Sequence, residues 1–323
     1  MIPKIITNTI PNEMSAVDRM IRDRLHSRVD LIKDVSKYII GGGGKRLRPA
    51  LVILSSLASG YSEGNDHFKL AAVVEFIHTA TLLHDDVVDD SSLRRGNATA
   101  NVVFDNSATV LVGDFLYSRA FQLVAEIQNQ EVTKELANAT NTIAEGEVDQ
   151  LVNLQDPEIT EDTYYQIVRS KTAQLFEVAG RLGAIIGNSE GGTRTALAEY
   201  GSHMGTAFQL IDDALDYSGD TAKIGKRLGD DFSQGKVTLP LIHAMAYGSK
   251  KEVENIRDAI ITKSTANLPL IIDILESQGS IDYVYGKAGY EVGRAIEALG
   301  NVPDSKYRKC MVDLAKFSVE RKH

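Results

Sequence analysis

The sequence predicts an all-α fold in a single domain, built around two long central helices. Apolar residues recur with a helical period along nearly the whole chain. The chain has only 7 prolines, and runs with the alternation and turn signals of β-hairpins are scarce. No stretch resembles a linker between domains, so residues 1–323 are expected to form one helical bundle.

The predicted elements follow from local signals. The first is an amphipathic helix over residues 12–40, which the four glycines at 41–44 end because glycine is costly inside a helix. Pro49 suits the first turn of the next helix, which runs on over Ala50–Ala58. A strongly apolar helix at 66–90 precedes a loop at 91–99. Later helices are predicted at 106–128, 131–154, 160–187 and 192–217, followed by a loop or lid at 223–236 and three or four shorter helices.

Composition excludes several classes of protein. The formal net charge of −9 argues against nucleic acid as the main partner. The single cysteine, Cys310, excludes an internal disulfide and suits a reducing compartment. No run approaches the roughly 18–20 apolar residues of a transmembrane segment, and the N-terminus has neither a signal-peptide nor a transit-peptide pattern. We therefore expect a soluble, cytoplasmic protein, although a targeting segment removed earlier would leave no trace here.

Two aspartate clusters of the same design carry the main functional signal. The first reads Asp85-Asp86-Val87-Val88-Asp89 and the second Asp212-Asp213-Ala214-Leu215-Asp216. Each is a DDxxD pattern at the C-terminal end of a predicted helix. Helical residues four apart project together, about 6 Å apart along the axis. The first and last aspartates of each motif therefore form a pair, and two carboxylates at that distance repel by roughly 3 kcal/mol at an effective dielectric of about 20.

This repulsion, with no cation inside either cluster, indicates two oxygen-rich sites for a hard metal ion. Magnesium fits because it takes one or two carboxylates and fills its other positions with water and substrate phosphate. Two such clusters facing one another would hold a phosphorylated ligand through metal bridges. A single acidic run is more often solvated surface, but the repeated motif with its apolar lead-in favours metal binding.

Basic groups that could bind phosphate lie before and after the first cluster. The segment Gly43–Pro49 places Lys45 and Arg48 between a glycine hinge and a helix start, which together form an anion site; the alternative is a linker with solvated charges. His78 lies two helical turns before Asp85 on nearly the same stripe. That position favours a phosphate contact over the structural role usual for a lone histidine, whereas His84 lies off the stripe and is interpreted as structural.

Arg94 and Arg95 follow the first cluster in the predicted loop. Their guanidinium groups are fork-shaped donors that suit diphosphate oxygens. The alternative is a surface ion pair with Asp89 or Asp90, which would contribute little.

A second set of polar residues accompanies the second cluster. Gln209 lies three, four and seven residues before its three aspartates, so it faces the same cavity. Lys171 and Thr172 lie within a predicted helix. Lys226 and Lys236 bracket the glycine-rich loop after the cluster, where closure of a lid could bring both to phosphate.

Taken together, these segments resemble the trans-polyprenyl diphosphate synthases. The matching segments occur in the family's order and span nearly the whole chain: residues 42–49, 75–89, 94–96, 112–115, 144–147, 170–173, 205–213, 229–231 and 235–236. The resemblance implies a helical bundle of the isoprenoid synthase type around a deep cavity, usually homodimeric. It also implies an enzyme that condenses an allylic diphosphate, such as farnesyl diphosphate, with isopentenyl diphosphate by means of magnesium.

The family pattern also implies residue roles. Asp85 and Asp89, with Asp86 beside them, match the first metal motif, and Asp212 and Asp216 match the second, with Asp213 in the same catalytic set. The residues that match the isopentenyl diphosphate site are Lys45, Arg48, His78 and Arg95. Those that match groups around the allylic substrate are Arg94, Lys171, Thr172, Gln209, Lys226 and Lys236.

The expected mechanism begins with about three magnesium ions that neutralise the diphosphate leaving group. The Thr172 hydroxyl, the Gln209 side-chain oxygen and the Lys171 backbone carbonyl then stabilise the allylic cation. The isopentenyl double bond adds to that cation, and the released diphosphate takes the proton, since no side chain here is an obvious base. Exclusion of water protects the cation from hydrolysis.

Product length is expected to depend on an apolar tunnel beneath the first cluster. Ala80 and Thr81 are small residues five and four positions before Asp85, where a bulky aromatic residue would stop elongation early. The helix descends about 16 Å from Thr81 to Leu70, and the family likeness favours a product of about forty carbons, suited to a quinone side chain. The expected wall and floor residues are Val74, Ile77, Phe121, Leu123 and Val124.

Three rival functions are less well supported by the residues. A terpene cyclase usually has a different second metal motif and needs no second diphosphate site. A regulatory, non-catalytic subunit typically loses one metal motif, whereas both are present here. A calcium-binding protein would leave the basic residues unexplained.

Overall fold

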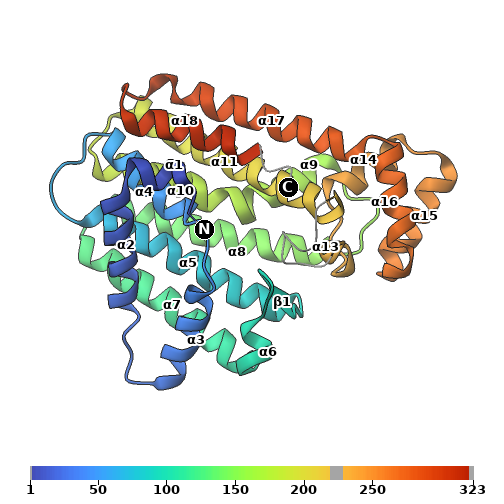
Figure 1. Cartoon of the computed structure of the whole chain (residues 1–323), viewed down its shortest axis with the longest axis horizontal. Helices are drawn as coiled ribbons and strands as arrows, with labels where there is room; N and C mark the ends of the chain where they lie inside the picture. The colour runs from blue at the N-terminus through green and yellow to red at the C-terminus, as the bar shows by residue number, and fades with distance from the viewer. Residues whose placement is uncertain (1, 219–227, 320–323) are drawn as a thin grey trace. The chain divides into compact units, whose positions relative to one another are not determined.

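The computed structural model describes residues 2–218 and 228–319, and its regular structure is almost entirely helical (Figure 1). The N-terminal half contains α1 (Lys4–Thr9), α2 (Pro11–Arg24), α3 (Asp30–Gly41), α4 (Leu47–Ala58), α5 (Asp66–Val88), α6 (Ala100–Phe104), α7 (Asn106–Ile127) and α8 (Gln130–Val152). The C-terminal half contains α9 (Glu161–Val168), α10 (Gln174–Ile186), α11 (Gly191–Ser218), α13 (Asp230–Ser233), α14 (Leu239–Tyr247), α15 (Lys250–Thr262), α16 (Leu268–Ser277), α17 (Ser280–Ala298) and α18 (Lys306–Val319). The all-α prediction is confirmed.

The predicted helix over residues 12–40 is wrong in one respect, because it is two helices, α2 and α3. After α2 the Ser27 hydroxyl accepts the Val29 backbone N–H at 3.1 Å. This local side-chain bond gives the backbone an alternative to the helical pattern. The apolar stripe continues through the break, so periodicity alone could not reveal it.

Three further expectations need adjustment. The stretch predicted as one helix at 160–187 is α9 and α10 joined by a π-helical turn, Arg169–Ala173. The predicted loop at 91–99 contains a small antiparallel hairpin of β1 (Leu93–Arg94) and β2 (Asn97–Ala98). Five α-helices, rather than three or four shorter ones, follow α13 in the described chain, and α17 is long.

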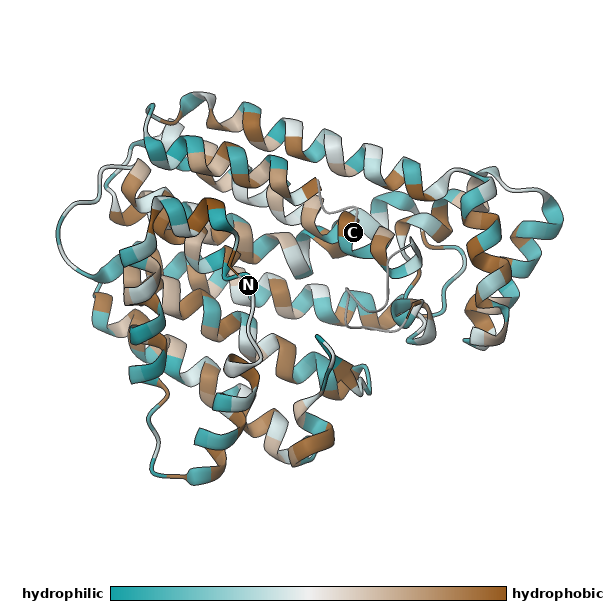
Figure 2. Cartoon of the chain, in the orientation of Figure 1, coloured by the Kyte–Doolittle hydropathy of each residue, from teal (hydrophilic) through white to brown (hydrophobic). Residues whose placement is uncertain are grey.

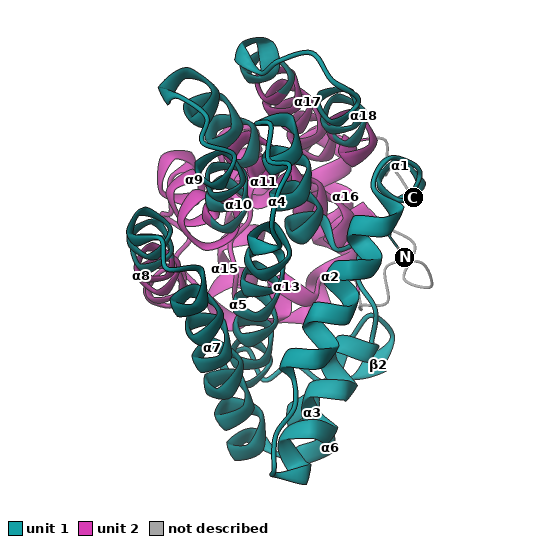
Figure 3. Ribbon diagram, turned by 90° about the vertical axis from the view of Figure 1, so that its left-hand side faces the viewer, with its two compact units in different colours: residues 1–139, 175–201, 296–314 teal, residues 140–174, 202–295, 315–323 magenta. Residues whose placement is uncertain are grey.

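The chain divides into two compact units, which Figure 3 colours separately. Unit 1 consists of residues 1–139, 175–201 and 296–314, and unit 2 consists of residues 140–174, 202–295 and 315–323. Every boundary between them falls within a helix, whereas boundaries between domains usually fall in exposed linkers. A single domain over residues 1–323 therefore stays our prediction.

The core of unit 1 is built on α5, which packs against α2, α4 and α7. Eight consecutive residues of α5, Leu70–Ile77, are all buried. Most other helices carry both apolar and polar residues along their length (Figure 2). None of the described helices combines the length and hydropathy needed to cross a membrane.

Glycine residues let α10, over its part in unit 1, pack closely against α11 and α4. A Cβ atom on Gly180 would lie 2.1 Å from the Leu197 carbonyl oxygen in α11, and one on Gly201 would lie 2.2 Å from the Phe176 carbonyl oxygen. A Cβ on Gly183 would meet Ser55 of α4 at 2.6 Å. This packing fixes the backbone at Phe176, whose ring supports a residue of the candidate site.

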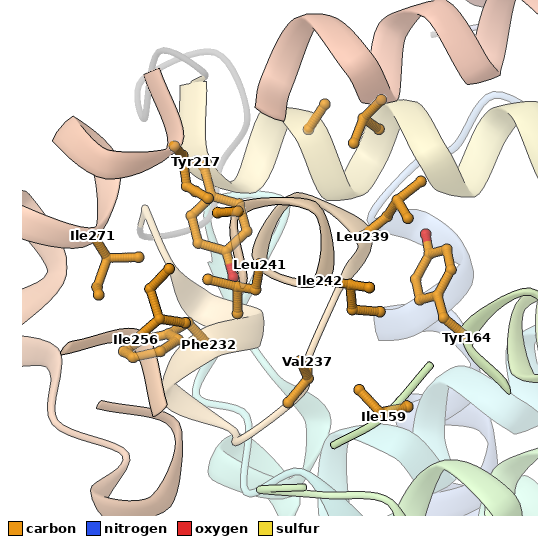
Figure 4. Close-up of a cluster of buried hydrophobic side chains, with 14 of the residues drawn as sticks. Ile159, Tyr164, Tyr217, Phe232, Val237, Leu239, Leu241, Ile242, Ile256 and Ile271 are labelled. Atoms are coloured by element: carbon orange, nitrogen blue, oxygen red, sulfur yellow. The ribbon is translucent and has the colours of Figure 1, made fainter. Parts of the chain in front are cut away.

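The core of unit 2 is a cluster of apolar side chains contributed by α9, α11 and α13–α17, together with the segment before α14 (Figure 4). Tyr217, at the end of α11, and Phe232, in α13, are both fully buried in it. Tyr164 of α9 also belongs to this cluster. The core therefore anchors both the helix that carries the second aspartate motif and the segment that follows it.

Candidate active site

The first aspartate motif lies at the C-terminal end of α5, in unit 1. Asp85 and Asp89 are partly exposed, whereas Asp86 is completely buried. Asp89 is the C-cap residue of the helix, and the negative end of the helix dipole lies there, which favours cations. The three aspartates therefore differ in environment, although the motif gives no sign of it.

Asp86 is held by Arg94 from the hairpin. Arg94 Nε and Nη2 donate to the same Asp86 oxygen, Oδ1, at 2.9 and 2.8 Å. Burial raises the pKa of Asp86, and the Arg94 guanidinium opposes that increase. The other oxygen, Oδ2, is buried without a hydrogen-bond partner. Arg94 thus pairs with Asp86 rather than with Asp89 or Asp90, the partners considered from the sequence.

The glycine hinge brings the basic segment against the loop after the first motif. The Gly44 backbone lies so close to the Arg95 guanidinium that a Cβ would be 3.2 Å from Nη1. Lys45 is exposed beside it. Arg46, by contrast, forms ion pairs with the buried Glu75 of α5 and with Asp18. Arg46 therefore anchors the segment. Lys45 and Arg48 of this segment, together with Arg95 of the loop, supply positive charge at this place.

Arg48 and His78 form one unit on adjacent helices. Arg48 Nη1 lies 3.3 Å from His78 Nε2, and the guanidinium carbon stands 4.2 Å above the Phe176 ring centre. Burial, followed by the charges of Arg48, Arg95, Arg94 and Arg46, holds the pKa of His78 well below its usual range. His78 is therefore a neutral imidazole that accepts the Arg48 N–H and orients the guanidinium.

Most of the expected tunnel residues are buried in α5 and α7. Val74, Ile77, Ala80, Leu123 and Val124 are each no more than 3% exposed, and Thr81 is half-buried. Phe121 differs, because it is 39% exposed and so is not enclosed by this chain alone. The tunnel stays a prediction.

His84 has the structural role expected for it. Its Nε2 atom lies 3.2 Å from the Val110 carbonyl oxygen and 3.4 Å from Asp114 Oδ1 of α7. The ring fills the space above Gly113, where a Cβ would approach Nε2 to 2.3 Å.

The second aspartate motif lies at the C-terminal end of α11, in unit 2. Asp212 is exposed, and Asp213 and Asp216 are buried. The Asp216 carboxylate accepts the backbone N–H groups of Asp230 and Asp231, each at 3.2 Å, and its carbonyl oxygen accepts that of Gly229 at 2.8 Å. Asp216 therefore fixes the start of α13 as well as belonging to the motif.

Asp213 is surrounded by hydrogen-bond donors. Gln209 Nε2 donates to Asp213 Oδ1 at 2.7 Å, and the Tyr164 hydroxyl donates to Oδ2 at 2.5 Å. Burial raises the pKa of Asp213 to about 7, with a further contribution from Asp231, and both hydrogen bonds act in the opposite direction. Thr172 Oγ1 donates to Gln209 Oε1 at 3.0 Å, so these two side chains are in direct contact.

Lys171 lies in the π turn and faces α8. Its ammonium group pairs with Glu147 at 2.5 Å and donates to Gln150 at 2.7 Å. A Cβ on Gly146 would lie 2.8 Å from the Lys171 backbone nitrogen, so only glycine allows this approach. π turns occur mostly as single-turn insertions and frequently at functional sites.

Of the two lysines expected around the loop after α11, only Lys236 falls within the described residues. Its ammonium group lies 2.7 Å from Gln234 Oε1 and 3.9 Å from Asp231 Oδ1. Lys236 thus lies beside the acidic residues that follow the second motif. Lys226 lies outside the described residues.

The carboxylates of both motifs suit a hard divalent metal ion, which binds through oxygen ligands. Over residues 2–218 and 228–319, no three or more His, Cys, Asp and Glu side chains gather into a metal-binding group. Magnesium needs only one or two carboxylates, because water and phosphate complete its coordination. Each motif has such a pair at a helix C-terminus, and the unpartnered Asp86 Oδ2 adds a buried acceptor at the first.

The fold is that of the all-α isoprenoid synthases. A crystal structure of polyprenyl synthase from Caulobacter crescentus, in complex with calcium and isoprenyl diphosphate, matches with a TM-score of 0.95 and 39% identity over 99% of this chain and 98% of that chain. The polyprenyl synthetase family model matches residues 29–275. This chain belongs to the polyprenyl synthetase family, so it is a prenyltransferase enzyme.

Curated relatives match along almost their whole length. Octaprenyl diphosphate synthase of Haemophilus influenzae is 46% identical over 312 residues, which is 96% of this chain and 94% of that protein. The all-trans-nonaprenyl-diphosphate synthase (geranyl-diphosphate specific) of Rhodobacter capsulatus is 43% identical over 313 residues, 97% of this chain and 96% of that protein.

Sequence reasoning missed several residues that contact the expected set. Tyr164 has no motif around it, and its contact with Asp213 spans 49 residues. Asp230 and Asp231 were visible as an acidic pair after a glycine, but only the fold places their N–H groups on Asp216. Phe176, which lies under Arg48, reads in the sequence as an ordinary core residue.

The low pKa of His78 predicts a pH dependence of stability. Below the unfolded-state pKa of about 6.5, the unfolded chain binds a proton at this position that the folded chain does not. The stability conferred by neutral His78 is therefore present above pH 6.5 and lost as pH falls toward the folded-state pKa. Urea unfolding of the metal-free protein should show that lowering the pH from 6.5 to 5.5 costs the wild type about 1 kcal/mol more than His78→Gln.

The matched control is His26→Gln, at an exposed position. It should follow the wild-type pH dependence. Equal pH dependence in His78→Gln and the wild type would contradict the prediction.

Proposed function

We propose that this chain is a magnesium-dependent long-chain trans-polyprenyl diphosphate synthase. In this proposal it extends farnesyl diphosphate with successive isopentenyl diphosphates to about forty carbons, the length named for its 46% identical octaprenyl relative. The observation that carries the proposal is the gathering of Arg48, His78 and Arg95 around the glycine segment beside an intact aspartate motif. A cyclase would need no such second cationic site.

Each group has a distinct task in this reaction. Magnesium, when held by Asp85 and Asp89 and by Asp212 and Asp216, supplies Lewis-acid stabilisation of the diphosphate charge, and about three ions per site are expected. Lys45, Arg48 and Arg95 bind the diphosphate of isopentenyl diphosphate through charge-assisted hydrogen bonds. Neutral His78 keeps the Arg48 guanidinium in position. Arg94, bound to Asp86, presents its remaining N–H groups to the allylic diphosphate.

The residues of α11 and the π turn act on the cation. The oxygens of Gln209 and Thr172 and the Lys171 backbone carbonyl stabilise positive charge without attacking it. The Lys171 ammonium, together with Lys226 and Lys236, binds the allylic diphosphate. The final proton goes to the departing diphosphate, because His78 and Asp213, the buried bases described above, are engaged in holding Arg48 and Gln209.

The decisive experiment is the reaction itself. Purified protein with farnesyl diphosphate, isopentenyl diphosphate and Mg²⁺ should give, after dephosphorylation and chromatography, a ladder that ends near forty carbons, and EDTA should abolish it because both carboxylate pairs need the metal. A ladder one unit longer would favour the nonaprenyl activity named for the Rhodobacter capsulatus relative. Cyclic hydrocarbons, or no product, would refute the proposal.

Product length should respond to bulk at Ala80, which is fully buried in α5. Ala80→Tyr places a ring five residues before Asp85 and should shift the main product to a shorter chain, as measured by the same chromatography. Thr81→Tyr, at a half-buried position, is a second variant with the same expectation. Leu270→Tyr adds similar bulk at an exposed position of α16 and should leave product length unchanged. Wild-type products from both α5 variants would show that this face does not line the tunnel.

We also propose a cytoplasmic homodimer whose product supplies quinone side chains, such as that of ubiquinone. Support for a dimer comes from α7, where Val110, Leu111 and Phe121 expose 37%, 66% and 39% of their surface. Exposed apolar groups of this kind commonly mark protein interfaces. Sedimentation should give twice the chain mass for the wild type and a larger monomer fraction for Leu111→Glu; a wild-type monomer would contradict the dimer.

A further inference from the structure

Tyr164 is a buried polar group that no motif explains. It lies on α9, is 4% exposed, and belongs to the apolar core of unit 2 (Figure 4). Burial raises the pKa of its hydroxyl well above the usual range. The hydroxyl therefore keeps its proton and acts as a donor, and its acceptor is Asp213 Oδ2.

The hydrogen bonds of Asp213 determine how the Gln209 amide is oriented. Asp213 Oδ2 is occupied by Tyr164, and Asp213 Oδ1 accepts from Gln209 Nε2. With its nitrogen on the carboxylate, the amide must direct its oxygen the other way, toward Thr172. The Thr172 hydroxyl donates to that oxygen. One continuous chain of hydrogen bonds thus runs from Tyr164 through Asp213 and Gln209 to Thr172.

The direction of the hydrogen bond between Thr172 and Gln209 decides whether oxygen atoms or N–H groups face a bound cation. Because Thr172 gives its hydroxyl proton to Gln209, the remaining lone pairs of the Thr172 oxygen are available to a cation. An amide turned by 180° would present N–H groups instead, which repel positive charge. A carboxylate fixed at only one oxygen could move and release the amide.

We propose that Tyr164 is a positioning residue, which acts through Asp213 to hold the Gln209 and Thr172 oxygens toward the allylic cation. This inference rests on the proposed function. It also assigns Asp213 to the orientation of Gln209 rather than to metal binding.

The test is Tyr164→Phe, which removes only the hydroxyl group. The chain of hydrogen bonds from Tyr164 to Thr172, here called the relay, stabilises positive charge that exists only after the allylic diphosphate has left. The kcat should therefore fall about tenfold, while KM for either diphosphate changes less than twofold. The matched control is Tyr165→Phe. Tyr165 is the neighbouring half-buried tyrosine, its ring packs edge-on to that of Tyr164 at 5.6 Å, and it takes no part in the relay; this variant should keep wild-type kinetics.

A double-mutant cycle separates positioning from a general loss of structure. If Tyr164 works through Gln209, Tyr164→Phe should cost less than twofold in a Gln209→Ala background, where no amide remains to be oriented. Equal tenfold losses in both backgrounds would overturn the proposal, as would wild-type kcat in Tyr164→Phe.

A second variant covers the case in which Tyr164→Phe does not fold because Asp213 Oδ2 loses its donor. The double variant Y164F/D213N removes the hydroxyl and the buried charge together. The amide that D213N introduces can then turn its nitrogen toward Gln209, so the same tenfold loss in kcat is expected, and wild-type kcat overturns the inference. A wild-type chain that makes no polyprenyl product would overturn the proposed function and this inference with it, whereas an active wild type with unchanged variants overturns the inference alone.

Discussion

The fold has to bury a carboxylate at the centre of each aspartate motif. Asp86 is completely buried and Asp213 is 2% exposed. A buried charge is costly unless hydrogen bonds compensate it. Unit 1 supplies Arg94 for Asp86, and unit 2 supplies Tyr164 and Gln209 for Asp213. In each motif the middle aspartate is thus held by side chains from other positions in its unit, and Asp216 is held in addition by the backbone N–H groups of Asp230 and Asp231.

The burial of individual aspartates separates what the sequence could predict from what it could not. The helices that carry the motifs, α5 and α11, have long apolar patterns and were predicted to within two residues of their bounds. Spacing alone paired Asp85 with Asp89 and Asp212 with Asp216. It could not show that Asp86 and Asp213 are buried, because burial depends on how the chain packs around them. Arg94 reaches Asp86 from the β1–β2 hairpin, and Tyr164 reaches Asp213 from 49 residues away.

The basic residues illustrate the same limit. Arg46 and Arg48 look alike in the sequence, two positions apart, yet Arg46 pairs with Glu75, whereas Arg48 lies on His78 and Phe176. Arg46 is the N-cap residue before α4 and has a left-handed backbone conformation, whereas Arg48 lies in the first turn of the helix, so the two side chains meet different neighbours. The stripe that His78 shares with Asp85 predicts only its position along α5, and the neutral state of the imidazole follows from its burial and the surrounding guanidinium groups.

The π turn over Arg169–Ala173 limits how this part of the chain can change in length. A π turn contains one residue more than an α turn, and one residue rotates a helix by about 100°. Thr172 reaches Gln209, and Lys171 reaches Glu147, only in the present rotational phase. Deletion of a single residue here would turn both side chains away from their partners, even if every remaining residue were kept. The number of residues in this turn is therefore as important to the two contacts as the identity of Lys171 and Thr172.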